Sequence, residues 1–148
     1  MTKEEKDLLK KALCEMLPYG VKLYHADDYG DNIGKLESIN ISNDECVIWN
    51  YNGTDTDIFD IEICKPVLRS MSSMTDEEFA YLQEYLPYDF TRIYSGKFDL
   101  INDIHLGNSV SIDDMVFLLE CFNKWHLDYR GLIPMGLALE APEGMYTK

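Results

Sequence analysis

The chain has 148 residues, of which 27 are acidic and 13 are Lys or Arg, and its formal net charge is −14. A charge of this sign and size opposes sequence-independent binding to nucleic-acid phosphates and to anionic lipid, so we expect no direct nucleic-acid partner and no membrane association. It favours a basic protein as partner, although solubility alone is the commoner reason for such a charge. The length and the 46% hydrophobic content predict a single globular domain over residues 1–148.

The sequence also indicates a compartment. No apolar stretch reaches the roughly 18 residues of a membrane span, and Met1 to Glu5 do not form the apolar run of a secretion signal. We therefore expect a cytoplasmic protein, and the oligomeric state stays open. Four cysteines are scattered without a C-x-x-C pair or a histidine at zinc-ligand spacing, which predicts reduced, partly buried thiols. They are Cys14, Cys46, Cys64 and Cys121. The sequence also lacks a phosphate-binding Gly loop and a dinucleotide fingerprint, so we expect no cofactor.

The first third of the chain predicts one helix followed by strands. Thr2 can cap a helix that runs to about Leu17. Leu9, Leu13 and Met16 follow one face of that helix at core spacing. Four short segments rich in β-branched and aromatic residues come next, each bounded by Gly, Asn or Asp. They are Val21 to His25, Lys35 to Ile41, Cys46 to Tyr51 and Ile58 to Ile63.

Two later helices complete the predicted fold. Thr75-Asp76-Glu77-Glu78 fits a capping box and starts a helix that ends before Pro87. Ser111 with Asp114 offers the cap of a third helix, and the element types of Tyr88 to Asn108 stay open. The sequence therefore predicts an α+β fold, with a small antiparallel sheet or partly closed barrel and about three helices packed around it.

The predicted strand region is strongly acidic. From Asp27 to Glu62 ten acids stand against Lys35 alone. The connections Asp27–Asn32 and Asn52–Asp57 have turn chemistry, and their oxygen-rich side chains raise the question of calcium. Neither connection fits an EF-hand loop: counted from Asp27, the sixth position is Asn32, where Gly is required. We therefore predict no metal site.

The most distinctive polar cluster lies near residue 126. Cys121, His126 and Asp128 could be a nucleophile, a base and an orienting group, but Cys121 and His126 are five residues apart and would point to different faces of one helix. His126, Asp128 and Arg130 are the candidate ligand-binding residues, if they converge on a cleft. The structural alternative, which is the more common, is that Asp128 caps a turn and Arg130 forms an ion pair. No catalytic residue is assigned.

Two segments resemble known proteins. They are Lys65–Glu78, KPVLRSMSSMTDEE, and Trp125–Pro142, WHLDYRGLIPMGLALEAP, of which the second is the more specific. Both are similar to a family of small acidic proteins from gut anaerobes and their prophages, for which no activity is established. The resemblance implies an intracellular protein linked to mobile elements, and it carries over no catalytic residue.

These observations favour a non-enzymatic interaction protein. The acidic strand region and the absence of a catalytic motif point that way, and so do Tyr81, Tyr85 and Tyr88, which follow roughly one helix face, because aromatic residues are favoured interface anchors. For the tyrosines, core packing with the hydroxyl at the edge is the more common explanation. Its partner would be a basic protein, and an anti-defence role is one function of this kind. The alternative is a small enzyme or small-molecule binder that uses a cleft near the candidate residues.

We also expect Trp125–Pro142 to pack on the fold, and removal of Met145–Lys148 to be tolerated.

Overall fold

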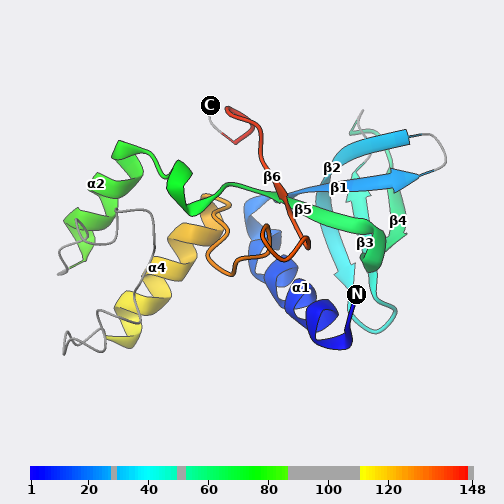
Figure 1. Cartoon of the computed structure of the whole chain (residues 1–148), viewed down its shortest axis with the longest axis horizontal. Coiled ribbons are helices and arrows are strands. Elements are labelled where there is room, and N and C mark those ends of the chain that lie inside the picture. The colour runs from blue at the N-terminus through cyan, green and yellow to red at the C-terminus, as the bar shows by residue number, and fades with distance from the viewer. Residues whose placement is uncertain (28–29, 50–52, 87–110, 147–148) are drawn as a thin grey trace. The chain divides into compact units, whose positions relative to one another are not determined.

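The structure, a computed structural model, describes residues 1–27, 30–49, 53–86 and 111–146 (Figure 1). The chain forms two compact units, which are treated separately here. Unit 1 comprises Met1–Leu68 and Arg130–Lys148, and unit 2 comprises Arg69–Tyr129. The described residues contain three α-helices and an open sheet of six strands, so the expected α+β class with a small sheet is confirmed.

Helix α1, Lys3–Met16, opens unit 1 and begins as the sequence predicts. The Thr2 hydroxyl accepts a hydrogen bond from the Glu5 backbone N–H at 3.1 Å, and the Glu5 carboxylate accepts one from the Thr2 N–H at 2.7 Å. This reciprocal capping box satisfies two backbone donors that the first turn would leave unpaired. A 3₁₀ turn, Leu17–Tyr19, follows the helix and ends at Gly20, whose φ of 71° suits glycine.

Six strands form the sheet of unit 1. Their order is β4-β3-β2-β1-β5-β6, and every pairing is antiparallel except the parallel pair β5–β6. The strands are β1 (Lys22–Asp27), β2 (Gly30–Asn40), β3 (Glu45–Trp49), β4 (Thr56–Asp60), β5 (Cys64–Leu68) and β6 (Leu139–Glu140). Strands β4 and β6 are therefore the two edges of the sheet.

One face of the sheet packs on α1 and forms the core of unit 1. Leu9 and Leu13 from the helix are buried together with Leu23, Leu36 and Ile48 from the strands. Since side chains alternate along a strand, the neighbours of these strand residues point to the opposite face. We call that opposite side the outer face.

Strand β2 joins the two halves of the sheet. Its first part pairs with β1 and its second part with β3, with an irregularity in register between Leu36 and Ser38. Gly34 lies at this junction, where an added Cβ would overlap the carbonyl oxygen of Trp49 and the Cγ2 atom of Ile48. The close approach of the two backbones at this point therefore requires glycine.

Some predicted boundaries differ from the observed ones. Strand β1 runs to Asp27 and strand β2 begins at Gly30, so most of the predicted loop Asp27–Asn32 is strand. Residues Ile61–Ile63 form a 3₁₀ turn, and the strand that follows, β5, contains Pro66. A proline fits this strand because β6 pairs only with Val67 and Leu68, so β5 is an edge at Pro66.

Unit 2 contains α2, Asp76–Tyr85, and α4, Ile112–Lys124. Both helices have the caps that the sequence predicts: Thr75 accepts from the Glu78 N–H in a capping box, and Ser111 accepts from the Asp114 N–H. The buried cluster of unit 2 is built from both helices and the chain after α4. Its buried members are Leu82, Leu86, Leu118, Cys121, Phe122 and Leu127. The open prediction for Tyr88 to Asn108 lies outside the described residues.

Arg69 connects the elements of unit 2. Its guanidinium donates to both carboxylate oxygens of Glu78, at 2.7 and 2.9 Å, and to the Trp125 carbonyl at the end of α4, at 3.3 Å. Its backbone pairs with the chain after α4: the Arg69 N–H donates to the His126 carbonyl and its carbonyl accepts from the Asp128 N–H, both at 2.8 Å. The segments Lys65–Glu78 and Trp125–Pro142 therefore both contribute to this one connection.

Candidate functional site

The edge strand β4 is the first candidate surface. Among the described residues it pairs only with β3, which leaves its other side without a neighbouring strand. Asp57 and Asp60 are exposed along it, with Asp55 just before it, and Ile58 is 65% exposed. This edge thus offers backbone hydrogen-bonding groups, carboxylates and one large apolar side chain on a single strand.

The acids along β4 differ from those beside α1. Asp44 forms ion pairs with Lys6, at 3.4 Å, and with Lys10, and Glu62 forms one with Lys6 at 2.6 Å. Within the described part of the chain, no ion pair involves Asp55, Asp57 or Asp60. Three of the strand-region acids without an ion pair therefore lie along or just before β4.

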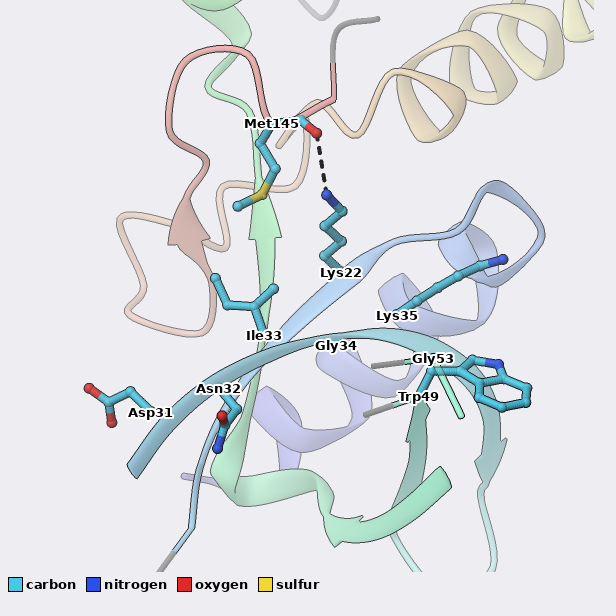
Figure 2. Close-up of a pocket in the computed structure, with 9 residues that line it drawn as sticks. All are labelled: Lys22, Asp31, Asn32, Ile33, Gly34, Lys35, Trp49, Gly53 and Met145. Atoms are coloured by element: carbon cyan, nitrogen blue, oxygen red, sulfur yellow. Dashed lines mark hydrogen bonds between the residues drawn. The ribbon is translucent and has the colours of Figure 1, made fainter. Parts of the chain in front are cut away.

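A groove on the outer face of the sheet is the second candidate. It has a volume of about 740 Å³, which lies in the range of small-molecule pockets. Figure 2 shows Asp31 at one end and Lys35 with Trp49 toward the other, with Ile33 and Lys22 between them. Unlike the β4 edge, this surface carries positive charge.

The three predicted ligand-binding residues belong to different units. His126 and Asp128 are buried in unit 2, whereas Arg130 belongs to unit 1. Arg130 forms a bidentate ion pair with Glu15 of α1, with nitrogen-to-oxygen distances of 2.6 to 3.2 Å. This contact ties the returning chain to α1, which is the structural role that the alternative interpretation gave to Arg130.

His126 ends α4 in a left-handed conformation. Its φ is 57°, its N–H donates to the Asn123 carbonyl at 3.1 Å, and the Leu127 N–H donates to the Phe122 carbonyl at 2.9 Å. These two bonds form a Schellman motif, in which this position is usually glycine. His126 thus has a backbone role, and its side chain is 6% exposed.

The thiols are free, and three of the four are buried. The neighbouring Cys46 thiol, together with burial, raises the pKa of the Cys64 thiol. Burial also raises the pKa of Cys121. A raised pKa keeps a thiol protonated and unreactive at neutral pH, which argues against Cys121 as a nucleophile. Cys14 on α1 is exposed.

The aromatic residues of α2 lie at the surface of unit 2. Tyr81 and Tyr85 are 41% and 57% exposed, and their ring centroids are 4.8 Å apart. Phe117 of α4 lies within 6.0 Å of both rings. Tyr88, the third predicted member, is outside the described residues.

The sequence analysis did not identify Lys22 and Lys35 as neighbours on adjacent strands. They lie directly opposite one another across β1 and β2. In this register Asp27 pairs with Gly30, and the turn-forming residues in this part of the sequence could have indicated a hairpin there. The β4 edge was also missed, because a strand's place in a sheet depends on pairings distant in the sequence.

The fold and its surfaces define an α+β protein with an acidic sheet edge and a separate basic groove. The chain matches no protein-family model, no curated protein and no solved structure. In the ranges that the structure describes, no three His, Cys, Asp or Glu residues are grouped to hold a metal ion, and no helix is long and apolar enough to cross a membrane.

Proposed function

We propose that this is a non-enzymatic interaction protein that binds a basic, extended segment of a partner protein along the β4 edge. The observation that carries the proposal is the side of β4 that pairs with no strand in the described part of the chain, together with its carboxylates. An added strand would take up backbone hydrogen bonds from this edge, which is a general mode of peptide recognition. The protein's net charge of −14 would speed the approach of a basic partner.

The composition of the edge favours one kind of occupant. Asp55, Asp57 and Asp60 would repel a second copy of the same edge, since charged side chains on edge strands oppose self-association. A segment that alternates basic and apolar residues would instead place cations beside Asp55 and Asp57 on one face of β4 and an apolar side chain against Ile58 on the other. The resemblance to prophage-linked proteins fits a host or phage protein as the source of such a segment, and inhibition of a defence protein is one consequence of binding it.

The alternative, a small enzyme or small-molecule binder at His126, Asp128 and Arg130, has less support. Arg130 is engaged by Glu15, and His126 forms the end of α4. Neither arrangement presents these groups to a substrate.

The proposal is tested with two peptides of equal charge. We expect an alternating Lys-Val peptide to bind the full chain measurably in low salt by fluorescence anisotropy, and a Lys-Gly peptide to bind more weakly because glycine disfavours strands. The double variant D55N/D57N should weaken binding of the Lys-Val peptide roughly tenfold. The double variant E4Q/D7N on α1 removes the same charge and serves as control. Equal weakening by both variants would show that only net charge matters and would overturn the proposal.

A further inference from the structure

Two lysines that form no ion pair among the described residues lie on neighbouring strands on the outer side of the sheet. Lys22 of β1 and Lys35 of β2 are directly opposite in register. Like charges in this position destabilise a strand pair. Among the described residues, neither lysine forms an ion pair, although the chain has 27 acidic residues. The arrangement leaves local positive charge in an acidic protein.

The groove around this lysine pair is concave and partly apolar, with Asp31 and Asn32 at one end. Ile33, which is 39% exposed, Trp49 and Met145 line the same groove of about 740 Å³. The Trp49 indole N–H donates to the Glu37 carboxylate, which holds the ring in place. Figure 2 shows Ile33 rising into the space between Met145 and the strands. The groove therefore combines two cationic side chains with apolar surface.

Lys22 already serves as a donor in this groove. Its ammonium donates to the Met145 carbonyl at 3.4 Å, which is long for a hydrogen bond, and lies 5.6 Å from the centre of the Tyr146 ring. In Figure 2 Lys35 points away from Lys22. Because lysine side chains have several rotatable bonds, both ammonium groups can turn toward a shared anion without a change in the backbone.

We propose that this groove is a binding site for a small organic anion that carries a flat apolar ring. Its phosphate or carboxylate group is bound between Lys22 and Lys35, and its ring lies on Ile33 and Trp49. The anion offsets the repulsion between the two lysines, and the ring buries apolar surface that now faces water. This site is separate from the β4 edge and does not depend on the function proposed for it.

The test follows backbone amides and the Trp49 indole by NMR while probes are added to the full chain. AMP tests a phosphate with a ring, and indole-3-acetate tests a carboxylate with a ring. Adenosine and inorganic phosphate each lack one half of the proposed ligand. We expect at least one ring-bearing anion to shift the signals of Ile33, Gly34 and Trp49, with Kd in the range of about 10 µM to 1 mM. Whichever of the two binds more tightly identifies the preferred anionic group.

Variants separate the lysine pair from general charge effects. K22Q/K35Q should weaken binding of that anion at least tenfold, whereas K22R/K35R should retain it within about threefold. K3Q/K11Q on α1 removes the same charge away from the groove and should have little effect, and retained signal dispersion shows that each variant is folded. The proposal is overturned if neither ring-bearing anion binds at 5 mM, if adenosine or phosphate binds as tightly as that anion, or if K3Q/K11Q weakens binding as much as K22Q/K35Q.

Discussion

At Gly34 the sheet has no room for a side chain. The backbone of β2 passes so close to Trp49 and Ile48 that a methyl group would overlap both. We expect Gly34→Ala to lower the free energy of unfolding by about 1–3 kcal/mol, because β2 and β3 must separate to admit it. Urea denaturation checks this. At Gly53 an added methyl group would meet no atom within 4 Å, but the φ of 64° strains any residue with a Cβ. Gly53→Ala therefore measures the cost of backbone strain without a steric overlap.

His126 looks like a binding-site residue in the sequence, but its role in the structure is to end α4 in a left-handed backbone conformation. We expect His126→Gly to be more stable than His126→Ala by about 1 kcal/mol, since both lose the imidazole but only alanine carries a Cβ in the left-handed region. Thermal or urea unfolding of the two variants gives the difference. If the alanine variant were as stable as the glycine variant, the Schellman geometry at the end of α4 would be wrong.

At the level of elements, α1 is held to the sheet by ion pairs with Asp44. A hydrogen bond from Lys10, with a further one from Lys6, lowers the pKa of Asp44 below its usual value of 3.8. A lowered folded-state pKa contributes stability above the unfolded-state value, and this contribution is lost as the pH falls through the folded-state pKa. Asp44→Asn should therefore lower the urea midpoint at pH 7, and the difference should shrink as the pH falls below about 4. Asparagine also tolerates the φ of 56° at this position, so the comparison isolates the charge.

The chain end is a second element held by specific contacts. The Tyr146 hydroxyl accepts a hydrogen bond from the Lys22 N–H at 3.0 Å and donates one to the Val67 carbonyl at 2.7 Å, and burial raises its pKa to about 12. We expected removal of Met145–Lys148 to be tolerated, and these contacts add that the removal should lower stability measurably. Tyr146→Phe should cost about 1 kcal/mol in unfolding free energy, and deletion from Met145 should cost more. An unchanged urea midpoint for the deletion would contradict these contacts.

The sequence predicted the elements that depend on local chemistry. Thr2 with Glu5, and Thr75 with Glu78, start helices at the expected positions because a capping box involves only residues three apart. Strand β5 was missed because Pro66 argues against a strand unless its neighbours are known. The many acids of the strand region are evident from the sequence. That the acids at β4 lack cationic partners is not, because it depends on Lys6 pairing with Glu62 and Lys10 with Asp44.

For the whole molecule, unit 1 is made of two separate parts of the chain. The chain leaves it at Leu68 and returns at Arg130, where Leu132 and Leu137 are buried in the core and β6 pairs with β5. The prediction that the segment after Trp125 is part of the fold is supported by this burial. Two surfaces of opposite charge then share one sheet: an acidic edge at β4 and a basic groove over β1 and β2.

Hydrogen–deuterium exchange of the β4 amides, with and without the alternating Lys-Val peptide, tests the central claim most directly. If the peptide adds to the sheet, exchange within Thr56–Asp60 should slow markedly at saturation, because edge amides that faced water become hydrogen-bonded to the added strand. The amides of α1 should show no comparable change. Binding of the peptide without protection of β4, or with protection confined to other elements, would contradict the account.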